Sequence, residues 1–94
     1  VMSFDMSQNY PNPFNPTTSI DFTTPEASQV TIVVTDMLGR TVSTLMNGQI
    51  AAGTHRANFD GAALNSGTYI ATVMATGNES GQTFTKSIKM TLNK

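Results

Sequence analysis

The chain has 94 residues, of which 12% are charged, and its formal net charge is -1. This length fits one domain with a small core, and the five cationic residues are too scattered to follow a phosphate backbone, so nucleic acid is not an expected partner. The chain has no cysteine, which excludes a disulfide framework, a thiolate zinc site and a cysteine nucleophile.

The sequence shows neither a membrane-spanning segment nor a secretory signal peptide. No apolar run approaches the ~20 residues that a transmembrane helix needs, so no transmembrane segment is expected. The chain begins with Val1 and shows no secretory signal peptide. We therefore expect it to be part of a longer protein, with any export signal upstream.

The first sixteen residues end in a proline-rich motif. Its members are Tyr10, Pro11, Asn12, Pro13, Phe14, Asn15 and Pro16. Each proline fixes φ, removes a main-chain donor and favours extended geometry in the preceding residue, which excludes a helix or a central strand. We expect an extended lead-in over residues 1–16, whose Tyr10 and Phe14 can lie on the domain. Two roles stay open for the motif: a cover for one sheet edge, or a direct contact with a partner.

Six segments then predict strands by alternation or by β-branched composition: residues 17–24, 29–35, 40–46, 54–59, 68–76 and 82–92. Residues 68–76 are apolar on both faces, so this strand is expected at the centre of a sheet. In the last segment Lys86 falls on the inward parity, so its aliphatic stem must cover apolar surface while its ammonium reaches water.

Gly, Asn and Pro mark the turns between these segments, at residues 25–28, 36–39, 47–48, 52–53, 60–67 and 77–81. About seven strands with turn signals at a spacing of roughly 8–12 residues are typical of an antiparallel sandwich. The predicted fold is all-β, an immunoglobulin-like or fibronectin-type antiparallel β-sandwich. We expect one domain over residues 1–94, with the lead-in at 1–16 and the sandwich at 17–94.

No group of residues predicts catalysis, a metal site or a cofactor. His55 is the only histidine, and no nucleophile motif accompanies it. Residues 60–66 hold one carboxylate, whereas Ca²⁺ prefers about six to eight oxygen ligands, so turn chemistry is the preferred interpretation there. Structural roles in turns and at a strand corner are expected for Asp36, Gly39, Arg40, Gly53, Gly67 and Tyr69.

Five blocks in a fixed order carry a resemblance to a known family. They are QNYPNPFNPTT at residues 8–18, VTDMLGR at 34–40, AGTH at 52–55, LNSGTY at 64–69 and KMTLNK at 89–94. With these blocks the chain resembles the type A C-terminal sorting domain of proteins exported by the type IX secretion system of Bacteroidota, the Por secretion system C-terminal domain family. A related β-sandwich occurs in flagellar hook-capping proteins, so the fold alone does not define the function.

The resemblance implies a signal carried by a larger cargo protein that is fused upstream. In the periplasm the domain folds and is recognised by the type IX translocon and its shuttle components. After passage across the outer membrane, a surface sortase cuts before the domain, and the cargo is attached to the surface of the Gram-negative cell or released. The resemblance also implies that Lys89, Met90, Leu92 and Lys94 take part in recognition. A terminal strand suits this role because it offers main-chain groups for strand addition.

Other function classes stay open. A carbohydrate-binding module usually relies on exposed aromatic rings, and this chain has no Trp, two Tyr and five Phe, most of them at inward positions. A structural module would assemble with partners and would not need the block at residues 89–94. Enzymatic activity is not expected. A weak homodimer through a strand edge is a further expectation, because edge strands present unpaired main-chain groups.

Overall fold

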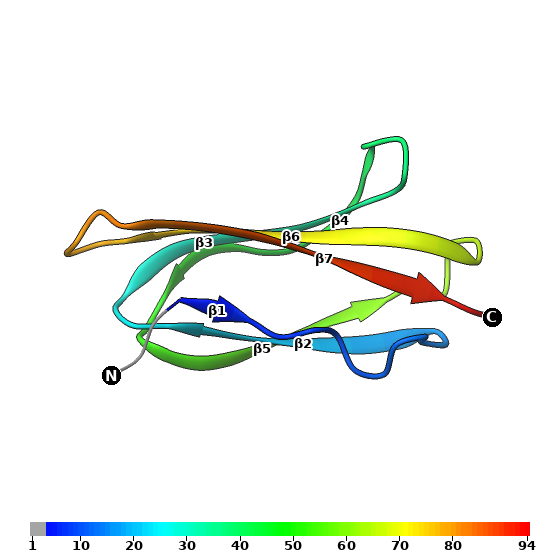
Figure 1. Cartoon of the computed structure of the whole chain (residues 1–94), viewed down its shortest axis with the longest axis horizontal. Coiled ribbons are helices and arrows are strands. Elements are labelled where there is room, and N and C mark those ends of the chain that lie inside the picture. Colours follow the sequence, from blue (N-terminus) through cyan, green and yellow to red (C-terminus); the bar gives the residue numbers. More distant parts are fainter. Residues whose placement is uncertain (1–3) are drawn as a thin grey trace.

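The computed structural model describes residues 4–94 as two antiparallel sheets packed face to face (Figure 1). The three-stranded sheet has the order β1 (Asp5–Met6), β2 (Thr17–Thr24) and β5 (Gly53–Asp60). The four-stranded sheet has the order β4 (Thr41–Ile50), β3 (Ser28–Thr35), β6 (Gly67–Gly77) and β7 (Thr83–Leu92). The predicted all-β sandwich of seven strands is confirmed. Within residues 4–94, no helix has the length and apolarity that crossing a membrane requires.

Alternation of burial along the strands explains why these segments fold as they do. In β2 and β3 every second side chain is buried, and the two strands contribute Ile20, Phe22, Val30, Ile32 and Val34 to one core. Side chains with period-two burial can leave water only by packing against a second sheet, which is why the sandwich forms.

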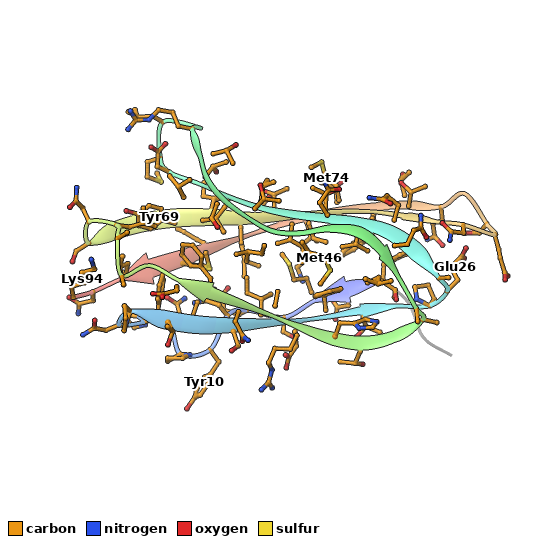
Figure 2. All side chains as sticks on the ribbon, turned by 180° about the vertical axis from the view of Figure 1, so that it is seen from behind. Tyr10, Glu26, Met46, Tyr69, Met74 and Lys94 are labelled. Carbon is orange, nitrogen blue, oxygen red and sulfur yellow. The ribbon has the colours of Figure 1, made fainter. Side chains whose placement is uncertain are left out.

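β6 lies inside its sheet, as its apolar composition predicts. It pairs with β3 on one side and with β7 on the other, over most of its length. Ala71, Val73 and Ala75 face the core, whereas Met74 lies on the outer face and is 45% exposed (Figure 2). One face of this central strand therefore stays accessible to solvent although both of its edges are paired.

The turn predicted at Asn47 and Gly48 is wrong, because β4 continues through both residues to Ile50. Asn47 lies opposite Thr31, and its side-chain oxygen accepts hydrogen bonds from Gln29 and Thr31. Gly48 is tolerated because β4 is an edge strand. Cross-strand pairing with β3 thus overrides the local preference of an Asn-Gly pair for a turn.

β1 was not among the predicted strands and lies within the lead-in. Asp5 pairs with Thr23 and Met6 with Phe22. The side chain of Met6 is 1% exposed. Two residues carry too little alternation to predict a strand, so only the packing of Met6 into the core reveals this one.

Candidate functional site

The lead-in lies along the outer edge of β7, near the end of the chain. Phe14 forms a parallel bridge with Leu92. The amide of Phe14 donates to the Thr91 carbonyl at 2.9 Å, and the amide of Asn93 donates to the Phe14 carbonyl at 3.0 Å. Residues some eighty positions apart in sequence are therefore joined by main-chain hydrogen bonds, and the lead-in covers this part of the edge.

Side chains of the lead-in complete the cover. The Asn12 side-chain oxygen accepts a hydrogen bond from the Thr91 amide at 3.0 Å. The Gln8 side-chain amide donates to the Lys89 carbonyl at 2.7 Å. These contacts satisfy groups of β7 that face away from β6. Of the two roles left open for the proline-rich motif, covering a sheet edge is the one present in the structure.

The ring of Phe14 anchors the lead-in. It is 1% exposed and meets Phe59 edge-on, with ring centroids 5.8 Å apart. Gly61 allows this approach, because a Cβ there would lie 3.1 Å from the Leu92 side chain and 3.4 Å from the Phe14 ring. Burial of an aromatic ring between the sheets makes the lead-in part of the folded core.

A buried polar network holds the lead-in on β2. The Asn9 side-chain amide donates to Thr18 Oγ1 at 3.0 Å and to the Pro11 carbonyl at 3.1 Å. The Thr18 hydroxyl in turn donates to the Pro11 carbonyl at 2.8 Å. Asn9 and Thr18 are both 3% exposed, so each needs these partners. The sequence does not predict this role for either side chain, because an isolated Asn or Thr carries no burial signal.

The four residues expected to take part in recognition lie in two different environments. Met90 and Leu92 are 0% and 1% exposed and belong to the core, whereas Lys89 and Lys94 are exposed. Lys94 Nζ donates to the Ala62 carbonyl at 2.6 Å, which holds the end of the chain on the loop before β6. Only the two lysines can present side chains to a partner while the domain stays folded.

Tyr10 lies on the domain through its main chain and not through its ring. Its main chain pairs with Ser19, but its ring is 83% exposed and projects away from the sandwich (Figure 2). Beside it is a hollow of about 220 Å³ lined by Gln8, Tyr10, Ser19, Asp21 and Arg56. The main-chain pairing fixes Tyr10 on β2, and the ring then has no core position to reach.

An exposed ion pair forms one wall of this hollow. Arg56 Nε donates to Asp21 Oδ1 at 2.8 Å across the β2–β5 pair. The hydrogen bond from Arg56, together with its charge, lowers the pKa of Asp21, and the same contact raises the pKa of Arg56. The wall thus offers both donors and acceptors with no net charge.

The residues assigned to turns and to the corner make local hydrogen bonds or adopt special main-chain conformations. The carboxylate of Asp36 accepts hydrogen bonds from the Leu38 and Arg40 amides and from Arg40 Nε, and the amide of Arg40 is the main cause of its lowered pKa. Gly39 has φ of +83°, a conformation that favours glycine.

The Tyr69 hydroxyl donates to the Asn65 carbonyl at 2.6 Å. Gly53 and Gly67, at the starts of β5 and β6, also have positive φ.

Glu26 holds the opposite end of the sandwich together, whereas the sequence predicts only a place in a turn for this residue. Its carboxylate accepts hydrogen bonds from the amides of Glu79 at 2.7 Å and Ser80 at 2.9 Å, in the β6–β7 turn. These hydrogen bonds, that of Ser80 first, lower the pKa of Glu26. A carboxylate that caps a distant turn leaves no local sequence pattern, so only the tertiary structure reveals it.

Within residues 4–94, no three His, Cys, Asp or Glu side chains gather as a metal site. His55 stacks on Phe22 at a centroid distance of 5.5 Å, and its Nε2 lies 2.7 Å from the Ala51 carbonyl. This histidine is held by structural contacts with Phe22 and Ala51.

The two sheets, joined at one edge by the lead-in and the last strand, define a small β-sandwich module. The chain belongs to the secretion system C-terminal sorting domain family, because the Por_Secre_tail family model matches residues 8–89. It is thus a type IX sorting domain, a signal that is fused to cargo, recognised by secretion machinery and associated with export to the cell surface or secretion. No curated protein and no solved structure matches the chain. The family match ends at Lys89, so residues 90–94 lie outside it.

Proposed function

We propose that this domain is a non-catalytic export signal that the type IX translocon reads in the periplasm, in its folded form. The observation that carries the proposal is the joining of the lead-in to the last strand, which brings two of the five sequence blocks that carry the resemblance, residues 8–18 and 89–94, to one edge of the sandwich. Because the core residues of the last strand are buried there, Lys89 and Lys94 are the side chains that a shuttle component of the machinery contacts.

We further propose that a sortase separates the domain from its cargo upstream of Phe4, after which the cargo is attached to the cell surface or released. Phe4 stacks on Phe84 with ring centroids 5.7 Å apart, and β1 follows immediately. A cut within β1 or the proline-rich motif would have to open this packing first. Mass spectrometry of the released domain tests this, and an N-terminus downstream of Met6 would contradict it.

The experiment for the main proposal fuses the domain to a periplasm-targeted fluorescent protein in a bacterium with a working type IX system. The fusion is expected at the surface or in the medium. The double variant Lys89→Gln/Lys94→Gln keeps the buried residues of the last strand and is expected to stay in the periplasm. The control is Arg40→Gln, which removes a single exposed cation on the β3–β4 turn. Periplasmic retention of the unmodified fusion would refute the export function.

A second candidate, sugar binding, is favoured by one observation. The exposed ring of Tyr10 stands beside a hollow whose wall carries the neutral Asp21–Arg56 pair, and aromatic faces with such donors and acceptors suit a sugar ring. Affinity electrophoresis in gels with neutral polysaccharides tests it. Retardation that Tyr10→Ala abolishes would support this candidate, and equal mobility in every gel would exclude it for the polysaccharides used.

A further inference from the structure

The outer edge of β7 consists of two parts. β7 is the last strand of its sheet, so one row of its main-chain groups faces away from β6. Hydrogen bonds from the lead-in identify this row, since they reach the carbonyls of Lys89 and Thr91 and the amides of Thr91 and Asn93. The odd-numbered residues of β7 therefore point their main-chain groups outward.

Among residues 4–94, no main-chain partner covers the upstream part of the same row. By the alternation of an antiparallel strand, the outward groups there belong to Thr83, Thr85 and Ser87. Within residues 4–94, none of these main-chain groups has a partner outside its own sheet. All three residues are exposed. We call the outer main-chain groups of Thr83, Thr85 and Ser87 the free edge.

The free edge lacks features that usually protect an edge strand. It contains no proline, and β7 pairs with β6 over ten residues without a register shift. The nearest cation, Lys86, turns away from it, because its Nζ donates to the Met6 carbonyl at 2.8 Å and to Asp5 Oδ1 at 3.3 Å. By contrast, β4, at the other edge of the sheet, has two register shifts against β3.

We infer that the free edge is a strand-addition site for an extended polypeptide segment of the export machinery. This inference rests on the proposed function. The lead-in supplies the precedent, because it already adds to the same strand in the parallel direction at Phe14 and Leu92. Five residues of β7 span roughly 17 Å, enough to pair a short extended segment through main-chain hydrogen bonds.

The neighbouring part of the edge is closed to such a segment. Phe14 is 1% exposed, so uncovering Lys89–Asn93 would require its ring to leave the core. The partner therefore pairs with the free edge and meets the lead-in where that pairing ends, beside the exposed Lys89. Recognition in the folded state thus combines main-chain pairing at residues 83–87 with side-chain contacts at the end of the strand.

Amide hydrogen exchange of the 94-residue domain tests whether the edge is free. The amides of Thr85 and Ser87 should exchange at least tenfold faster than those of Thr91 and Asn93, which donate to the lead-in. Equal protection of all four amides would overturn the inference, whatever the outcome of any secretion assay.

Secretion of the fluorescent fusion tests the use of the edge. Thr85→Pro removes an outward amide and leaves the bonds to β6 intact, because proline is accepted in an edge strand where its nitrogen faces solvent. Secretion should fall at least tenfold. Thr85→Ala, the matched control, removes the side chain but keeps the amide, and it should be secreted like the unmodified domain. Secretion of a folded Thr85→Pro fusion at the unmodified level would overturn the inference while the sorting function stands.

A second pair of variants covers the case in which Thr85→Pro does not fold. Thr85→Lys/Ser87→Lys places charges on the free edge, whereas Thr76→Lys/Met74→Lys places the same charges on the outer face of β6, whose main chain is paired on both sides. Only the first pair should lower secretion. Equal secretion of both pairs would overturn the inference.

A concentration-dependent dimer that Thr85→Pro abolishes would also overturn it, because a second copy would then occupy the edge.

Discussion

The lead-in should contribute measurably to folding stability through Phe14. Replacing this buried ring with Ala removes its contact with Phe59 and leaves a cavity beside Leu92. Buried Phe→Ala substitutions cost about 3–5 kcal/mol. For Phe14→Ala we expect a loss of about 3 kcal/mol in the free energy of unfolding, the low end of this range. The reason is that the lead-in lies at the edge of the sandwich and can move inward to fill part of the space. In a domain of this size that corresponds to a fall of roughly 12–24 °C in melting temperature.

Urea unfolding followed by circular dichroism measures this change. The control is Tyr10→Ala, which removes a large aromatic ring from the same motif but one that is 83% exposed, and it should change stability by less than about 0.5 kcal/mol. If Phe14→Ala cost less than about 1 kcal/mol, or no more than Tyr10→Ala, the lead-in would not be part of the core. Lys89–Asn93 would then not stay covered in the folded domain.

Three further predictions concern the ends of the sandwich. Glu26→Gln should reduce stability at neutral pH. In thermal melts the difference in stability from the unmodified domain should shrink as the pH falls through the lowered pKa of Glu26, because the Glu26 carboxyl is then protonated in the folded and in the unfolded state. Tyr69→Phe should lose about 1 kcal/mol in urea unfolding, since it removes the hydrogen bond to the Asn65 carbonyl. Gly39→Ala should lower the melting temperature, because φ of +83° strains any residue with a Cβ. The control is Gly48→Ala, because Gly48 has no positive φ and a Cβ there would meet only open space.

Each of these predictions has an outcome that contradicts it. A pH-independent difference for Glu26→Gln would mean that the carboxylate does not hold the β6–β7 turn. An unchanged midpoint for Tyr69→Phe would mean that water replaces the Asn65 carbonyl without cost. Equal melting temperatures for Gly39→Ala and Gly48→Ala would mean that the β3–β4 turn relaxes away from positive φ.

The sequence by itself determined the class of fold and the position of most strands. Alternation in β2 and the β-branched run in β3 bury one face of each strand, and burial of one face is a local property that periodicity records. Local chemistry likewise predicted the turn at Gly39 and the interior place of β6. It failed at Asn47 and Gly48, where pairing with β3 outweighed a turn preference of the two residues themselves.

Only the tertiary structure decided what surrounds the last strand. The lead-in and the last strand join opposite ends of the chain through the contacts of Gln8, Asn12 and Phe14 with Lys89–Asn93. No local pattern encodes a partner about eighty residues away. The same is true of Glu26, whose carboxylate caps a turn in another part of the sequence. The sequence also did not distinguish Tyr10 from Phe14, whereas main-chain pairing with β2 and β7 leaves one ring in solvent and places the other in the core. Residue type fixes what a side chain can do, and long-range packing fixes which of these roles it takes.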